Sequence, residues 1–403
     1  MEPVSKPKRL IMIGGWTDIY KKANICGISV TLVQEKQKIT MEDMEYIDQL
    51  YTFQLDDPIL PELFALLHAK EPFDCVVSFQ EFGLLTAAAI KEKLGLFGNP
   101  MEPVLLTRDK HRMRDVMDKH QFPSLPYSIV TSEQDVTGFI RKQGLPVILK
   151  PVYGSGSFQI YKISESAQIP QAIKSIKEVY KREEILVEKF IEGKEISVEG
   201  FTWDGKHTMI AVTDKFTTGA PHFVETGHNM PSSLPESIQS AARQLAFDFM
   251  DLIGHKFGPS HTEIMVSDGH LYIIESHTRT GGDYIFEMVN QVYGFDMFLE
   301  TLKGFAGINP NTEPASMEAA AAIRYLKLED GWISRVEGID SARQIPGVLK
   351  CDISLQVGQR VKSFCKSSER NGSVLARGES MEAALNSIHA ALNTISIEVS
   401  ESV

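Results

Sequence analysis

A run of polar residues follows an apolar stretch within residues 270–286, HLYIIESHTRTGGDYIF. Residues 271–274 have the apolar character of a buried strand, and Glu275, His277 and Arg279 then follow on alternate positions. Because side chains alternate between the two faces of a strand, these three lie on one face. Carboxylates bind hard metal ions, and a guanidinium stabilises a transferring phosphoryl group or clamps a carboxylate. The stretch therefore has groups suited to phosphoryl transfer.

A second carboxylate, Glu263, precedes this stretch in a predicted hairpin, HTEIMVSDGHLYIIESH. A three-residue loop at 267–269 would place Glu263 and Glu275 diagonally on one face, whereas a two-residue Asp-Gly loop would place them on opposite faces. Two close carboxylates repel each other unless a cation lies between them, and Mg²⁺ suits such a pair. The alternative is a solvated acidic face, but the apolar neighbours of both residues favour a metal site.

A glycine-rich turn interrupts two apolar segments in PVILKPVYGSGSFQIYKI. Lys150 ends the first segment, and small residues in the turn allow backbone N–H groups to approach phosphate oxygens beside its charge. A structural hairpin over a buried lysine is the alternative, and no GxxxxGK[ST] loop occurs. The candidate phosphate-binding residues of this turn are Gly154, Ser155, Gly156 and Ser157.

The stretch ILVEKFIEGKEISVEGF follows with two predicted strands around a linker. The linker, residues 188–191, has backbone groups that could bind the edge of an adenine. In the second strand Glu195, Ser197 and Glu199 share one face, and a carboxylate there could accept ribose hydroxyls. An edge strand with a solvated acidic face is the alternative.

The rest of the chain suggests three domains in a combination of α/β and α+β folds. The segments RLIMIGG, ISVTLVQ and FDCVVSF read as buried parallel strands, and GLLTAAAIKEKLG as a helix that ends at Gly95. Thr107 is a plausible N-cap for a helix in TRDKHRMRDVMDKH. Boundaries near FGNPMEP and after GINPNTEP predict domains at 1–104, 105–308 and 309–403.

Composition limits the function classes. The net charge of −12 over 403 residues argues against a nucleic-acid or anionic-membrane surface as the main partner. The four cysteines form no CxxC pair, and the Gly14-Gly15 turn does not complete GxGxxG. No segment could serve as a signal peptide or cross a bilayer, so a cytoplasmic protein is expected.

Taken in this order, the stretches resemble the ATP-grasp superfamily, specifically its carboxylate–amine ligases, over residues 105–305. The likeness is greatest to L-amino acid ligases of the bacilysin-synthetase type. It implies an ATP-grasp fold with an N-terminal βαβ domain and a C-terminal mixed α+β domain, with ATP and Mg²⁺ as cofactors. It also assigns roles by position: phosphates at Lys110, Lys150 and the turn from Gly154 to Ser157; adenine at Glu188, Lys189 and Ile191; ribose at Glu195; metal at Glu263 and Glu275; the acyl phosphate at Arg279.

One position departs from that family's pattern. Most relatives read E-x-N-x-R where this chain has Glu275-Ser276-His277-Thr278-Arg279, so His277 is equally a metal ligand or a hydrogen-bonding neighbour. In PHFVETGHNMPSSLP the resemblance places substrate-facing groups: Glu225 could hold an amino group, and His228 could contact a carboxylate or tetrahedral intermediate.

The resemblance implies an enzyme that activates an amino-acid carboxylate as an acyl phosphate and couples it to an amine. Its partners would be small-molecule amino acids, with no nucleic acid and no membrane. Two alternatives stay open: loading of an amino acid onto a carrier-protein thiol, and a nucleotide-binding subunit without catalysis. The sequence leaves the oligomeric state open, a homodimer included.

Overall fold

The N-terminal part of the chain is a parallel sheet between helices. A computed structural model describes residues 8–154, 156, 158–315 and 319–401. The predicted buried strands are confirmed, and all neighbours in the sheet are parallel. In spatial order the strands are β3 (Gln49–Thr52), β2 (Ile28–Gln34), β1 (Lys8–Ile13) and β4 (Cys75–Val77). The connecting helices are α1 (Thr17–Ile25), α2 (Leu60–Lys70) and α3 (Leu84–Leu94), the last ending at a left-handed Gly95 as predicted.

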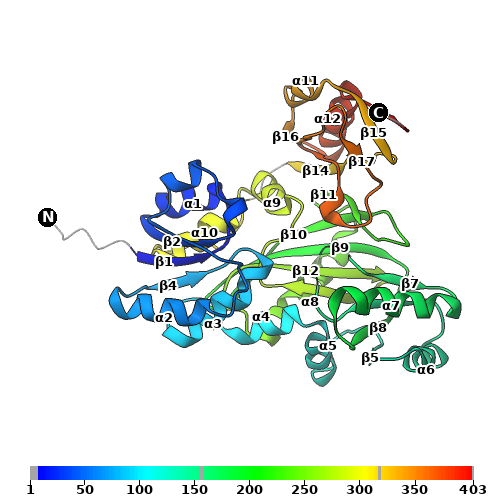
Figure 1. Cartoon of the computed structure of the whole chain (residues 1–403), viewed down its shortest axis with the longest axis horizontal. Helices are drawn as coiled ribbons and strands as arrows, with labels where there is room; N and C mark the ends of the chain where they lie inside the picture. Colours follow the sequence, from blue (N-terminus) through cyan, green and yellow to red (C-terminus); the bar gives the residue numbers. More distant parts are fainter. Residues whose placement is uncertain (1–7, 155, 157, 316–318, 402–403) are drawn as a thin grey trace.

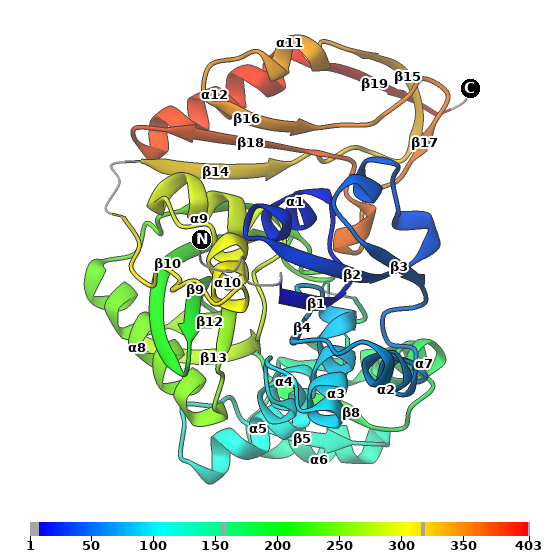
Figure 2. The same ribbon diagram turned by 90° about the vertical axis from the view of Figure 1, so that its left-hand side faces the viewer.

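A helix distant in sequence completes the core of this part. Helix α10 (Met297–Phe305) places Phe298, Leu302 and Phe305 against residues of α1, β1 and β2. Figure 2 shows α10 beside α1. Residues beyond the predicted boundary at 104 therefore contribute to the N-terminal hydrophobic core.

Two helices lead from the parallel sheet into the next layer. Helix α4 (Met101–Arg108) ends immediately before α5 (Lys110–Lys119). The prediction of Thr107 as an N-cap is wrong, because Thr107 lies inside α4 and bonds to the Pro103 carbonyl. Asp109 caps α5 instead: its carboxylate accepts from two backbone N–H groups of the first turn, at 3.0 and 3.1 Å. This cap fixes Lys110 at the first position of the helix.

A small antiparallel sheet follows. Its spatial order is β5 (Tyr127–Val130), β8 (Ile185–Lys189), β6 (Val147–Pro151) and β7 (Tyr161–Ile163). Helices α6 (Glu133–Gln143) and α7 (Ile169–Tyr180) supply apolar side chains to its core.

The largest element is an eight-stranded antiparallel sheet (Figure 1). Its first strands in space are β13 (His270–His277), β12 (Phe257–Ser267), β9 (Lys194–Trp203), β10 (Lys206–Thr217) and β11 (Glu225–Met230). Helix α8 (Glu236–Ile253) packs on Ile196, Val198 and neighbouring apolar residues of this sheet, and α9 (Ile285–Tyr293) packs on another part of it. The predicted alternation in β9 is confirmed, since Ile196 and Val198 are buried in this core while Glu195 lines a cavity.

The C-terminal part continues the same sheet. Strands β14 (Ala320–Tyr325), β18 (Ser373–Gly378) and β16 (Val348–Asp352) extend it beyond β11. A three-stranded sheet of β17 (Arg360–Val361), β15 (Gly331–Glu337) and β19 (Ser396–Ser400) completes this part with α11 (Ile339–Arg343) and α12 (Met381–Thr394). The domain boundaries at 104 and 308 stay predictions. Within the described residues, none of the helices combines the length and apolar character that crossing a bilayer requires.

Candidate nucleotide and metal site

One cavity of about 540 Å³ gathers the predicted site residues from all parts of the chain. The walls come from the end of the parallel sheet, the small antiparallel sheet and the large sheet. A segment of the C-terminal part that contains Ser367, called the C-terminal segment below, forms a further wall. Ser155 and Ser157 lie outside the described residues. All the other predicted residues line the cavity: Lys110, Lys150, Gly154, Gly156, Glu188, Lys189, Ile191, Glu195, Glu225, His228, Glu263, Glu275 and Arg279.

Glu263 and Glu275 are direct neighbours across two strands. The turn between them has two residues, Asp268 and Gly269, because Ser267 pairs with His270. A two-residue turn was expected to place the carboxylates on opposite faces, and that expectation is wrong. The register shifts by one residue between Glu263 and Ile264, so that Glu263 pairs with Glu275 and one residue of β13 is left over. This β-bulge returns Glu275 to the face of Glu263.

The extra residue at the bulge is Ile274. Ile273 is buried in the core under the sheet, whereas Ile274 and Glu275 both line the cavity although they are consecutive. A bulge allows this because two residues of one strand face a single residue of its partner. The bulged strand thus gives the cavity an apolar side chain and a carboxylate side by side.

Lysines neutralise the two carboxylates. The Lys110 Nζ lies 2.8 Å from Glu275, and the Lys215 Nζ lies 2.8 Å from Glu263. Burial alone would raise the pKa of each glutamate, but these ammonium groups outweigh it: the pKa of Glu275 is lowered, and that of Glu263 is held well below its ordinary value with help from His261. Both carboxylates are therefore ionised and able to bind a cation.

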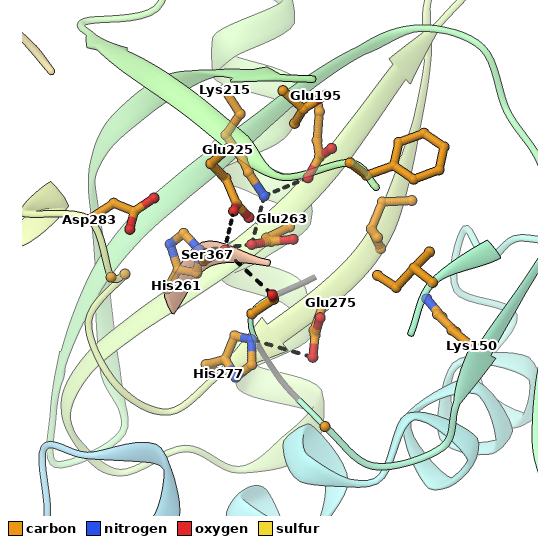
Figure 3. Close-up of a pocket in the computed structure, with 18 of the residues that line it drawn as sticks. Lys150, Glu195, Lys215, Glu225, His261, Glu263, Glu275, His277, Asp283 and Ser367 are labelled. Atoms are coloured by element: carbon orange, nitrogen blue, oxygen red, sulfur yellow. Dashed lines mark hydrogen bonds and ion pairs between the residues drawn. The ribbon is translucent and has the colours of Figure 1, made fainter. Parts of the chain in front are cut away.

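Lys215 is a site residue that the sequence analysis missed. Its side chain lies between Glu263 and Glu195, with Nζ 2.5 Å from Glu195 (Figure 3). Although burial opposes a charged amine, these carboxylates raise the pKa of Lys215 well above its usual value. A lysine within the apolar pattern of a central strand was the available signal, because such residues are seldom buried without a partner.

The small sheet contributes a second buried ion pair. The Lys150 Nζ lies 2.6 Å from Glu188, which also accepts a hydrogen bond of 2.7 Å from Arg114. Burial raises and the two cations lower the pKa of Glu188, with a net value of about 2. The Lys110 ammonium donates to the Gly154 carbonyl at 2.9 Å, so the first lysine contacts the glycine-rich turn. Lys110 and Lys150 therefore both line the cavity, each in an ion pair with a glutamate.

Gly154 has a backbone that other residues rarely adopt. Its φ is +139°, and a Cβ there would lie 2.5 Å from the Tyr180 hydroxyl. Tyr180 thus packs against the turn where only a hydrogen fits. This close contact explains the glycine by geometry, independently of any ligand.

Glu81 enters the cavity from the parallel sheet. It begins a short turn after β4, and it accepts a 2.7 Å hydrogen bond from the Arg279 Nε. The His277 Nδ1 lies 3.2 Å from Glu81, and the His277 Nε2 lies 3.6 Å from Glu275. The surrounding cations overcome the effect of burial and hold the pKa of Glu81 well below its ordinary value. The sequence analysis missed Glu81, although ligands commonly bind at the carboxyl ends of parallel strands.

The C-terminal segment closes another side of the cavity. The Ser367 hydroxyl donates to Glu225 at 2.7 Å, and Figure 3 shows it pointing toward that carboxylate. The Nε2 of His228 lies 3.0 Å from Asp283, and Arg370 forms an ion pair with the same carboxylate. Arg370 and His228 outweigh burial and strongly lower the pKa of Asp283. The predicted substrate-facing residues Glu225 and His228 thus meet groups more than 50 positions away, which no local motif reveals.

Comparisons with known proteins bear on the fold. The model of the ATP-grasp domain matches residues 143–287, and that of the ATP-grasp N-terminal domain matches residues 20–98. The chain belongs to the ATP-grasp superfamily. A third model, L-amino acid ligase C-terminal domain 2, matches residues 324–400 of this ATP-grasp chain. The predicted fold class and resemblance are therefore confirmed.

Individual proteins are similar over much of the chain. Alanine–anticapsin ligase of Bacillus subtilis (strain 168) is 28% identical over 298 residues, which cover 67% of this chain and 62% of the relative. An L-arginine-specific L-amino acid ligase of Bacillus subtilis is 22% identical, covering 74% of this chain and 73% of the relative. Among solved structures, an L-amino acid ligase from Bacillus licheniformis has a TM-score of 0.83 at 19% identity, covering 98% of this chain and all of the other. The chain thus spans less than two thirds of alanine–anticapsin ligase.

The carboxylates fit the magnesium that the superfamily implies. Glu263 and Glu275 are ionised, face each other across the strands and lie in the cavity with two lysines. Within the part of the chain that the structure describes, no group of three or more His, Cys, Asp or Glu side chains is arranged to hold a metal alone. The pair of Glu263 and Glu275 suits Mg²⁺, which binds through one or two carboxylates and takes its other ligands from phosphates and water.

Proposed function

We propose that this ATP-grasp chain is an ATP-dependent ligase that joins an amino-acid carboxylate to an amine and releases ADP and phosphate. The observation that carries this proposal is the cross-strand pair of Glu263 and Glu275 in one cavity with Lys110 and Arg279. The similarity to proteins named as amino acid ligases supports the same reaction class.

In the proposed first step, a carboxylate oxygen of one amino acid attacks the γ-phosphorus of ATP. The bond from that phosphorus to its bridging oxygen breaks, ADP leaves with the electron pair, and an acyl phosphate forms. Such a transfer needs positioning and charge neutralisation more than covalent help from the protein. Lys110 and Lys150 would hold phosphate oxygens, and Arg279 would neutralise the transferring group.

Magnesium held by Glu263 and Glu275 would supply further neutralisation of the phosphate oxygens. For binding, Lys110 and Lys215 would each turn from a glutamate to a phosphate oxygen, since each forms an ion pair with one of these carboxylates. The turn with Gly154 and Gly156 would cover the phosphates and exclude water.

In the second step, the amine of another substrate attacks the acyl carbon. Phosphate leaves, the nitrogen loses a proton, and an amide or dipeptide results. Glu225 would receive an amino group: its carboxylate accepts a hydrogen bond from the Ser367 hydroxyl, and it could accept one from an ammonium in the same way. His228 lines the same cavity and is oriented by Asp283.

Release of phosphate from ATP tests this function. The purified chain with ATP and Mg²⁺ should release phosphate when suitable pairs of amino acids are added, and mass spectrometry should detect the dipeptide or amide. Arg279→Met should lower the turnover about 100-fold, whereas Arg335→Met, at an exposed arginine of the C-terminal part, should not.

Other outcomes would contradict the ligase. Release that requires a carrier protein with a reactive thiol would indicate thiol loading. A chain that binds ATP but releases no phosphate with either kind of acceptor would indicate a nucleotide-binding subunit. A cytoplasmic location and the oligomeric state stay predictions that these experiments do not address.

A further inference from the structure

Arg114 is the largest fully buried side chain in the described part of the molecule. It lies one turn after Lys110 on α5, and residues four apart share one face of a helix. Lys110 reaches into the cavity, whereas Arg114 is not among the described residues that line it. Any effect of Arg114 on the cavity must therefore act through the groups that it contacts.

The terminal nitrogens of the guanidinium bind the β-bulge. The two terminal nitrogens of Arg114 donate to the carbonyls of Ile273 and Ile274, each at 2.9 Å. A bulge disrupts the regular ladder of backbone hydrogen bonds, and a buried carbonyl without a donor is costly. Arg114 thus satisfies both carbonyls at the point where Ile274 and Glu275 turn toward the cavity.

The remaining nitrogen of the guanidinium, Nε, binds the small sheet. The Nε of Arg114 donates to one oxygen of Glu188 at 2.7 Å, and Lys150 occupies the other oxygen at 2.6 Å. The planar guanidinium fixes the directions of its donors relative to each other. The positions of the bulge and of Glu188 are therefore linked through one rigid group.

We propose that Arg114 is a positioning residue for the metal and phosphate ligands. It holds the bulge so that Glu275 faces Glu263, and through Glu188 it orients Lys150. This inference rests on the proposed function, because it assumes that these residues bind Mg²⁺ and a nucleotide. Arg114 lies outside the cavity. It would nevertheless set the distance between the two carboxylates on the large sheet and Lys150 on the small sheet.

Calorimetric titration with ADP, with and without Mg²⁺, tests the proposal without relying on catalysis. Arg114→Lys keeps a charge for Glu188, but a single ammonium cannot donate to both carbonyls in the same fixed fork. The factor by which Mg²⁺ increases ADP affinity should fall about 10-fold, as expected when a group that orients a metal ligand is lost. Arg112→Lys, at an exposed arginine of the same helix, is the matched control and should keep the wild-type factor.

Glu188→Gln tests the contact between Arg114 and Glu188 separately from the contacts between Arg114 and the bulge. It removes the link to Lys150 but leaves the donors of Arg114 on the bulge, so ADP should bind more weakly while the magnesium factor stays at the wild-type value. Equal magnesium factors in Arg114→Lys, Arg112→Lys and the wild type would overturn the inference. So would a magnesium factor that falls as much in Glu188→Gln as in Arg114→Lys. Wild-type protein that does not bind ADP at all would instead remove the proposed function.

Discussion

The buried carboxylate of Glu188 should contribute strongly to stability at neutral pH. Its exposed fraction is 2%, and Arg114 and Lys150 lie at 2.7 and 2.6 Å. Its pKa is about 2, against 4.5 for an ordinary glutamate. Since one pKa unit corresponds to about 1.4 kcal/mol, the ionised form stabilises the fold by about 3 kcal/mol at pH 7.

The sign of the pH dependence follows from the lowered pKa. A depressed carboxyl pKa gives stability that is present above the unfolded pKa and is lost as the pH falls toward the folded one. Glu188→Gln mimics the protonated acid, so it should cost about 3 kcal/mol at pH 7 and less than half of that at about pH 3.

Thermal unfolding across pH measures this contribution. For a chain of 403 residues that unfolds as a unit, about 3 kcal/mol lowers the melting temperature by about 3–4 °C. The gap between the wild type and Glu188→Gln should narrow as the pH falls from 5 to about 3. Glu192→Gln, at an exposed glutamate nearby, should show no gap. A gap for Glu188→Gln that stays constant over this pH range would refute the reasoning.

Three further results are expected. Glu275→Gln should raise the Mg²⁺ concentration for half-maximal phosphate release at least about 10-fold; an unchanged requirement would contradict its role as a ligand. Lys215→Met should weaken binding of ADP with Mg²⁺ about 10-fold or more in calorimetry, since a charge-assisted contact is worth about 1.5–3 kcal/mol; unaltered affinity would contradict the expected phosphate contact. Asp283→Asn should lower the melting temperature above about pH 4, where the depressed pKa of Asp283 makes its ionised form stabilising, and the difference from the wild type should shrink below that pH; a constant difference would contradict the ion pair with Arg370.

Local periodicity predicts much of this fold. Buried strands such as β1 and β2 are short and mostly apolar, and the helix that ends at Gly95 carries its own stop signal. The alternation of Glu195 with Ile196 is likewise local, because one residue of each pair must face the core. These features depend on neighbours in the sequence, so one sequence suffices to predict them.

The hairpin that carries Glu263 and Glu275 marks the limit of such reasoning. A period of two, counted from the two-residue turn at Asp268 and Gly269, would separate Glu263 from Glu275. The bulge at Ile274 instead brings the two glutamates to the same face. The carbonyl of Ile274 accepts a hydrogen bond from Arg114, which lies 160 positions earlier in the chain. A register that depends on a distant donor cannot be read from the strand itself.

The same limit applies to the walls of the cavity. Glu81 meets Arg279 across 198 positions, and Ser367 meets Glu225 across 142. No motif links residues at such separations, because only the packing of the parallel sheet and the C-terminal segment against the large sheet brings them together. The motifs thus predicted residues that line one cavity, whereas the groups around them could be identified only from the structure.

The lysines of the site are paired with its carboxylates. Each lysine that is predicted to bind phosphate forms an ion pair with a glutamate of the predicted site. Lys110 lies 2.8 Å from Glu275, and Lys150 lies 2.6 Å from Glu188. Lys215 pairs in the same way with Glu263. Buried charges without partners would destabilise the fold, so these pairs allow the lysines and carboxylates to be buried together. Nucleotide and metal together can replace the Lys110–Glu275 and Lys215–Glu263 pairs without leaving a charge unpaired, since phosphate takes the lysines while Mg²⁺ takes the carboxylates. Either ligand alone would leave one partner of each ion pair without a counter-charge. For this reason we expect nucleotide and Mg²⁺ to bind cooperatively.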